Sequence, residues 1–132
     1  MVSQSEGEDS PRPFITAARW RLDAGDLPDG FAYPEIFMRV LARQLVELEP
    51  WWFLEGRGLV STRAGLIARY PEHDYIPFAY RQDCDDTACW DGDPTTGVLI
   101  VHDFAGPGYE INAHFDTFEA WFRHAVDDML EW

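Results

Sequence analysis

The chain has 132 residues, 46% of them hydrophobic, which predicts one globular domain. It carries 24 acidic side chains against 10 basic ones, and its formal net charge is −14. All ten basic residues are arginine. Because a protein that grips a phosphate backbone or an anionic lipid surface needs clustered cations, this charge argues against nucleic-acid and membrane binders.

Several residue types and segments that carry particular functions are missing. The sequence has no lysine, so we expect neither a Walker phosphate loop nor Schiff-base chemistry. No apolar run approaches the ~20 residues of a membrane-spanning helix, and residues 1–13 lack the apolar core of a secretion signal. Cys84 and Cys89 are too few for a disulfide framework. We therefore expect a cytoplasmic protein with free thiols.

The N-terminal part of the chain begins with a polar stretch. Residues 1–12 contain little that can be buried and predict a disordered tail, with a single domain over residues 13–132. Residues 14–22 predict a short strand or an extended lead-in. The Asp, Pro and Gly residues of positions 26–30 then predict a turn.

The next segment predicts two helices around a short strand. Apolar residues recur at spacings of three and four over residues 34–50, which indicates an amphipathic helix between two prolines. Residues 51–54 predict a strand, and the glycines of positions 56–58 predict the turn after it. Ser61 is expected to cap a second helix, which Tyr70 ends because the following proline disfavours helical angles.

The second half of the chain is typical of a sheet. Short aromatic or β-branched runs predict strands over residues 75–80, 87–90, 98–101 and 109–114. Their short links favour antiparallel pairing. Asp116 and Glu119 form a candidate capping box, and an apolar stripe from Phe118 to Leu130 predicts a closing helix. The pattern predicts an α+β domain whose largely antiparallel sheet is packed by N-terminal and C-terminal helices.

One acidic cluster stands out as a candidate binding site. It comprises Asp83, Asp85, Asp86, Asp91 and Asp93, with no basic residue between them. We interpret it as an acidic face for a cationic partner, with Tyr80 and Trp90 as aromatic anchors. The carboxylates could instead bind Ca²⁺ or Mg²⁺, although their spacing does not match an EF-hand loop. A third reading is that they cap turns and discourage pairing at a sheet edge.

The cysteines and histidines do not have the spacing of a metal site. Cys84 and Cys89 are separated by four residues rather than two, and we expect Cys89 to be a small buried hydrophobe. His102 and His114 could meet across neighbouring strands beside a cysteine, but nothing in the sequence brings them together. His124 is expected on the surface of the last helix. We predict no catalytic residues, no metal and no cofactor.

The aromatic residues are expected to fill the core. Phe, Tyr and Trp number 20, and each buries a large area. Trp51 and Trp52 are consecutive in a predicted strand, so they face opposite sides. One of the two is therefore expected to be partly exposed or covered by a helix or a partner.

Several short motifs occur in an order that resembles a known family. They are Leu27-Pro28, Tyr70-Pro71, Ile76–Ala79, Asp85–Asp91, Val98–Val101 and Phe115–Phe122. Over roughly residues 25–131 this order is similar to the SUKH superfamily, small domains related to the yeast Smi and Knr cell-wall regulators. The resemblance implies an α+β fold with a mixed sheet packed by helices. It also implies the role of many bacterial members, which are immunity proteins that neutralise polymorphic toxins, many of them nucleases.

Charge and resemblance together favour a non-enzymatic protein-binding module, an immunity protein that holds a basic toxin domain. Complementary charge accelerates such an association, although a high net charge also serves solubility. We expect a monomer or a weak homodimer. The alternatives are a cytoplasmic regulatory adaptor of the same fold, or a small metal-dependent hydrolase that uses Asp85, Asp86 and a histidine.

Overall fold

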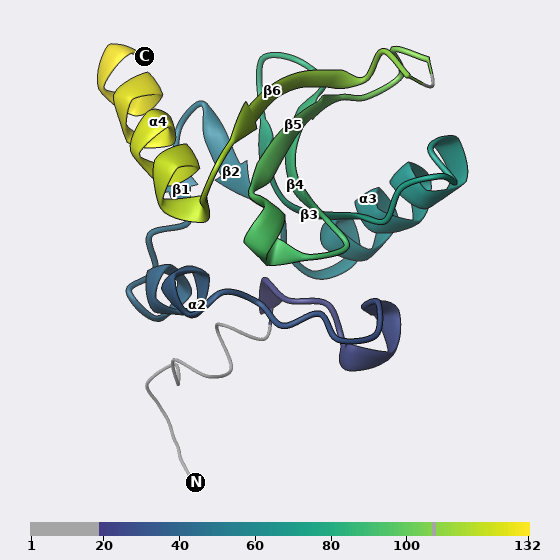
Figure 1. Ribbon diagram of the computed structural model, residues 1–132. Helices are drawn as coiled ribbons and strands as arrows, with labels where there is room; N and C mark the ends of the chain where they lie inside the picture. The colour runs from purple at the N-terminus through teal and green to yellow at the C-terminus, as the bar shows by residue number, and fades with distance from the viewer. Residues whose placement is uncertain (1–18, 107) are drawn as a thin grey trace, which may run out of the picture.

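A computed structural model describes residues 19–106 and 108–132, so the predicted tail of residues 1–12 lies outside the described part. Figure 1 shows a curved sheet flanked by helices. The described elements are η1 (Ala24–Asp26), α2 (Glu35–Ala42), β1 (Glu47–Leu48), β2 (Trp51–Phe53), α3 (Gly56–Arg69), β3 (Tyr75–Arg81), β4 (Asp86–Asp91), η2 (Pro94–Thr96), β5 (Val98–His102), β6 (Ile111–Phe115) and α4 (Phe118–Glu131).

The six strands form one sheet in the order in which they occur along the chain. All five pairings between them are antiparallel, and α3 is the long connection between β2 and β3. The predicted α+β class with a largely antiparallel sheet is confirmed. The described strands contain no parallel pair, so the mixed pairing implied by the resemblance is not found among them.

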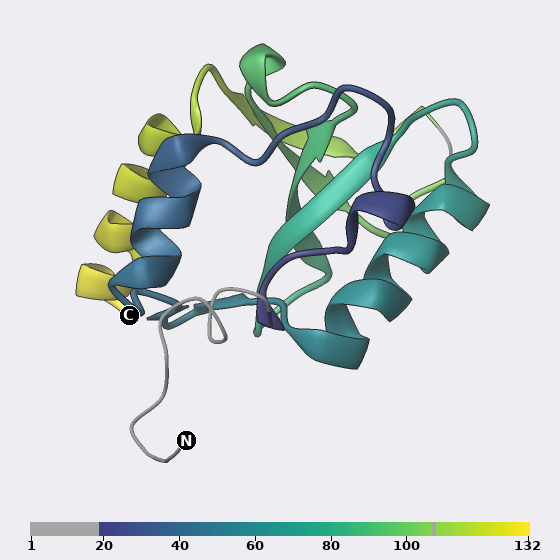
Figure 2. The same cartoon turned by 90° about the horizontal axis from the view of Figure 1, so that it is seen from below.

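Helices cover both faces of the central strands. Figure 2 shows α2 beside α4 on one side of the sheet and α3 on the other. Aromatic rings fill the larger core under α2 and α4, where Trp90 lies 4.4 Å from Phe78 and Phe78 lies 4.9 Å from Trp121, between ring centroids. A smaller core under α3 contains Tyr75 and Cys89. Cys89 is thus the small buried hydrophobe that the sequence predicts.

The consecutive tryptophans of β2 face opposite sides, as expected from strand geometry. Trp51 is 2% exposed, whereas Trp52 is partly exposed. The exposed indole of Trp52 donates a hydrogen bond from Nε1 to Gln82 Oε1 at 2.7 Å. The alternation prediction is therefore confirmed.

The helix predicted over residues 34–50 is shorter than expected. It ends at Ala42, and Gln44 adopts a left-handed backbone with φ 58°. Leu48 then enters β1 and pairs with Trp51. Apolar residues three or four apart suit either a helix or the end of a helix followed by a strand, and the pairing with β2 decides between the two.

The second helix begins earlier than predicted, because the glycines at positions 56–58 form its first turn. Glu55 precedes the helix in an extended conformation, and Ser61 lies inside it rather than at its cap. Glycine disfavours helices by ~1 kcal/mol per residue, but Leu59 is buried in the main core. Tertiary burial thus outweighs local preference. The predicted end at Tyr70 is confirmed.

Candidate functional site

The five predicted aspartates do not form one continuous face. Asp86 begins β4 and Asp91 ends it, and a strand advances ~3.4 Å per residue. These two residues therefore mark opposite ends of the sheet. Asp83 and Asp85 lie with Asp86 near the β3–β4 turn, while Asp93 follows Asp91 at the other end.

The aspartates at the far end of β4 have structural roles. Asp91 lies 2.9 Å from His73 Nδ1 and accepts a hydrogen bond of 2.8 Å from the backbone N–H of Asp74. Asp93 precedes η2 and accepts from the backbone N–H of Thr95 at 2.9 Å. Hydrogen bonds from Thr95 lower the pKa of Asp93. Asp91 and Asp93 therefore match the third interpretation of the cluster, in which the aspartates cap turns and anchor loops.

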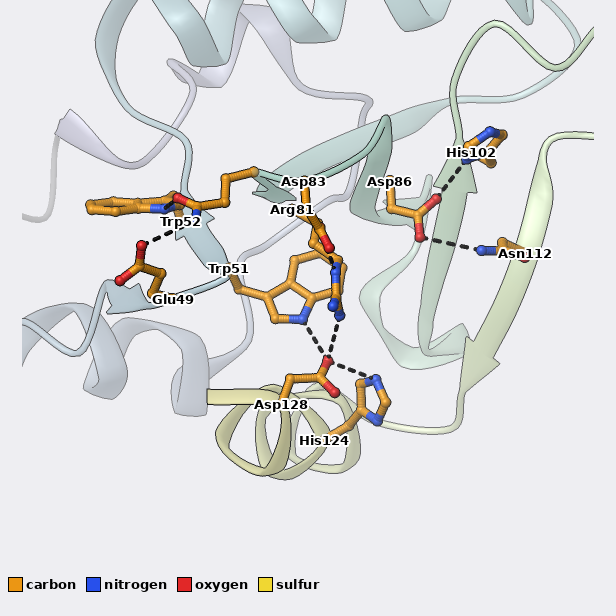
Figure 3. A network of polar contacts seen from close by, with 11 residues as sticks. Glu49, Trp51, Trp52, Arg81, Asp83, Asp86, His102, Asn112, His124 and Asp128 are labelled. Carbon is orange, nitrogen blue, oxygen red and sulfur yellow. Dashed lines mark hydrogen bonds and ion pairs between the residues drawn. The ribbon is translucent and has the colours of Figure 1, made fainter. Parts of the chain in front are cut away.

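The aspartates near the β3–β4 turn differ in how they are paired (Figure 3). Asp83 accepts a hydrogen bond from Arg81 Nε at 2.7 Å, which lowers the pKa of Asp83. Asp86 Oδ1 lies 2.8 Å from His102 Nδ1, and its second oxygen accepts from Asn112 at 3.2 Å. Asp85 is exposed, and its carboxylate has no partner among the described residues.

A groove of about 620 Å³ runs between α3 and the start of β4. The small residues Gly58, Ser61, Thr62 and Gly65 form its α3 wall. Asp85 and Asp86 lie on the opposite wall with Tyr80, which is 39% exposed. The fold thus brings three of the seven predicted binding residues to one concave surface.

Trp90, the other predicted aromatic anchor, does not line the groove. It was predicted as an aromatic anchor for a partner, but its side chain is fully buried in the main core. In a strand covered on both faces, neither face presents side chains to solvent, and Phe37 and Phe78 pack against Trp90. The prediction is wrong for this residue.

The groove contains residues that sequence reasoning missed. Arg69 donates to both carboxylate oxygens of Asp103, with Nε 2.8 Å from Oδ1. Tyr70 donates from its hydroxyl to the same Asp103 oxygen at 3.2 Å. The Arg69 guanidinium also lies 4.3 Å above the ring of Phe104, which is 69% exposed. The one sequence signal that could have found these residues is Phe104, a large apolar residue in the loop between two predicted strands.

The electrostatics of the groove favour a cation. Its lining contains one guanidinium, that of Arg69, which the carboxylate of Asp103 already neutralises. The negative charges of Asp85 and Asp86 remain. Cys84 also lies here, and burial raises the pKa of its thiol, so the thiol stays protonated at neutral pH. The arrangement can hold an ammonium or guanidinium group beside exposed aromatic rings.

A second polar network holds the β3–β4 turn in place (Figure 3). Trp51 donates from Nε1 to Asp128 Oδ2 at 2.9 Å, and Arg81 donates to the same oxygen at 3.1 Å. His124 Nε2 lies 3.2 Å from that oxygen. His124 is exposed, as predicted, but it also helps to join α4 to the sheet. Arg81 therefore links the last helix to Asp83 at the edge of the site.

The histidine pair considered for catalysis is not formed. His102 ends β5 and contacts Asp86, whereas His114 lies opposite Leu99 near the other end of β5. In residues 19–106 and 108–132, no three His, Cys, Asp or Glu side chains are grouped so that they could hold a metal ion. Of the residues named for the hydrolase alternative, Asp86 and one histidine, His102, are in contact.

Glu110 forms a buried polar cluster that the sequence did not predict. It is 1% exposed and accepts hydrogen bonds from Tyr75 Oη at 2.6 Å and from the backbone N–H of Gly108 at 2.7 Å. Burial raises the pKa of Glu110, but these hydrogen bonds outweigh it and the net pKa is lowered. His73 stacks on Tyr75 with 4.8 Å between ring centroids. A lone glutamate before a strand carries no sequence signal for such a cluster.

Comparison with known proteins adds no relative: no family model, curated protein or solved structure matches the chain. No helix of the described residues has both the length and the apolar character needed to cross a bilayer. The site is therefore interpreted from its own geometry.

Proposed function

We propose that the protein is a non-enzymatic binding module that holds a basic protein partner in the groove between α3 and β4. The observation that supports it is the unpaired carboxylate of Asp85 beside Asp86 and the exposed ring of Tyr80. Aromatic side chains with nearby charges are typical of residues that dominate binding energy.

The proposed partner is a toxin domain, and the protein its immunity protein. This part of the proposal rests on the resemblance to the SUKH superfamily and on the net charge of −14. A nuclease toxin needs a cationic cleft for its substrate, and an acidic inhibitor can fill it. Charge complementarity also raises the association rate at low salt. We place this function in the cytoplasm, where free thiols such as those of Cys84 and Cys89 persist.

The test begins with capture of the partner from the strain that encodes the protein, followed by binding kinetics with the purified partner. Asp85→Arg is expected to weaken binding about tenfold or more, ~1.4 kcal/mol. Asp85→Arg combined with Asp86→Arg is expected to weaken it further. Added salt is expected to slow association of the wild-type protein.

Asp116→Arg is the matched control, because the Asp116 side chain is 95% exposed and lies at the opposite end of the sheet. It makes the same charge change outside the groove. Equal effects of Asp85→Arg and Asp116→Arg would assign the binding to net charge alone. A partner that binds Asp85→Arg as tightly as wild type, at any salt concentration, would contradict the proposed site.

The nature of the captured partner separates the toxin from the adaptor alternative. A protein with a toxic activity that the wild-type chain abolishes supports the immunity role. A regulatory partner that binds the same groove would support the proposed site, but it would make the protein an adaptor rather than an immunity protein. For the hydrolase alternative, a rise in melting temperature with Ca²⁺, Mg²⁺, Mn²⁺ or Zn²⁺ would be needed, since a ligand that binds only the native state stabilises it.

A further inference from the structure

A second groove lies between α2 and α4. These two helices lie on the side of the sheet opposite α3 (Figure 2). It has a volume of about 650 Å³, and its apolar floor is formed by Ile36, Val40, Leu45, Phe118, Phe122 and Val126. Leu45 is 42% exposed. An apolar surface of this kind between two helices matches grooves that receive a third helix.

Three arginines surround this floor: Arg39 from α2, Arg43 from the C-terminal cap of α2, and Arg123 from α4. All three are exposed, and none has a hydrogen-bond or ion-pair partner among the described residues. Other arginines differ, since Arg69 and Arg81 each bind carboxylates. The groove lining also contains two carboxylates, those of Glu119 and Asp127, so three guanidiniums against two carboxylates leave it with a net positive charge in a chain of net charge −14.

We propose that this groove docks an acidic amphipathic helix of a protein partner. Arg39 in α2 and Arg43 at its C-terminal cap are four residues apart, so they stand about one helical turn, ~5.4 Å, apart along the helix axis. Carboxylates at the same spacing on the incoming helix meet both guanidiniums, and guanidinium binds carboxylate in two-pronged geometry. The apolar stripe of that helix then covers the floor.

The α4 rim sets the orientation of the incoming helix. Glu119 and Asp127 flank Arg123, one turn away on either side. These carboxylates repel further negative charge, so the acidic edge of the partner faces α2 rather than α4. A second copy of the chain fits the groove less well than a separate helix. Each copy carries 14 excess negative charges, and their mutual repulsion opposes self-association.

The probe that tests this docking is a fluorescently labelled amphipathic helix of leucine and glutamate, with glutamates four residues apart. Its binding to the full chain is measured by anisotropy. Arg39→Glu combined with Arg43→Glu is expected to weaken binding at least tenfold. Arg57→Glu is the control for each of the two single reversals, Arg39→Glu and Arg43→Glu, because Arg57 is also exposed and without a partner among the described residues but lies on α3. It is expected to leave binding unchanged.

Any one of the following results would overturn the proposal. The first is equal binding of a peptide in which lysine replaces every glutamate, and the second is undiminished binding by the Arg39→Glu/Arg43→Glu variant. The third is that the wild-type protein binds anionic vesicles, or dimerises as its concentration rises, and that the Arg39→Glu/Arg43→Glu variant does neither. The fourth is peptide binding seen only with Glu6→Gln, Glu8→Gln and Asp9→Asn together, which would make the acidic N-terminal segment of the chain the occupant.

Discussion

Buried carboxylates are the residues whose environment departs furthest from what their positions in the sequence indicate. Asp103 is 8% exposed and is neutralised by Arg69, whereas Glu110 is 1% exposed with no arginine or lysine bonded to it. Glu110 accepts hydrogen bonds from the hydroxyl of Tyr75 and the backbone N–H of Gly108, and His73 Nε2 lies 3.7 Å from the oxygen that Tyr75 binds. A buried charge without such partners costs several kcal/mol, and together these contacts lower the pKa of Glu110 despite its burial.

Replacement of Glu110 by glutamine is predicted to lower the free energy of unfolding by about 1–3 kcal/mol at pH 7. The glutamine side chain keeps one acceptor oxygen, but its NH2 group replaces the second. One of the two donors, the Tyr75 hydroxyl or the Gly108 N–H, then faces another donor. Because the folded pKa of Glu110 is lowered, its charged form stabilises the fold above the unfolded pKa, near 4.5. That stabilisation is lost as pH falls through the folded value.

The measurement is urea unfolding of both proteins between neutral pH and about pH 3, a range that includes the usual carboxyl pKa values. The difference in unfolding free energy is expected to be largest at neutral pH and to shrink in acid. Glu72→Gln is the control, since Glu72 is exposed near the same pocket. A difference that is constant across this pH range would show that the charge of Glu110 does not contribute.

The boundaries of helices depend on contacts that the local sequence only partly reveals. The sequence pattern placed a capping box on Asp116 and Glu119, but the structure begins α4 one residue later. Thr117 is the cap, and its hydroxyl oxygen accepts a hydrogen bond of 3.0 Å from the backbone N–H of Ala120. The capping prediction is therefore wrong by one residue, although the helix itself is confirmed.

Thr117→Ala is predicted to destabilise the fold by about 1 kcal/mol, the usual cost of losing a cap. Asp116→Ala is predicted to have little effect, because its side chain is 95% exposed. Thermal unfolding of the two variants beside the wild type separates them directly. If Asp116→Ala is the more damaging of the pair, Asp116 rather than Thr117 caps the helix.

The charge of the whole molecule is its dominant long-range property. A net charge of −14 repels itself within a compact domain, and this repulsion opposes folding. Many of the described ion pairs are exposed, such as Arg19 with Glu55, and pairs of that kind contribute little. We therefore expect repulsion between charges to outweigh the attraction within ion pairs.

The melting temperature is predicted to rise by several degrees as NaCl increases from about 0.01 M to about 1 M, over which the screening length falls from about 30 Å to about 3 Å. The same titration with KCl is the control for specific ion effects. A melting temperature that falls with salt would mean that ion pairs, such as Arg69 with Asp103, contribute more than the repulsion removes.

The elements of this fold follow largely from local pattern. Aromatic and β-branched runs predicted β3, β4, β5 and β6 close to their observed bounds, and the apolar stripe from Phe118 predicted α4. Such features depend on side-chain spacing within a few residues, which the sequence states directly. Where the same spacing fits a helix or a strand, as at Leu48, local pattern is insufficient.

The site depends instead on tertiary structure. Asp85 and Asp86 were named from the sequence, but only the pairing of strands separated Asp91 from them and buried Trp90. The groove exists because α3 and the start of β4, which are separated by β3 in the chain, lie on either side of it. Such proximity is a property of the packed molecule, because spacing along the sequence does not specify which surfaces meet when long-range contacts form.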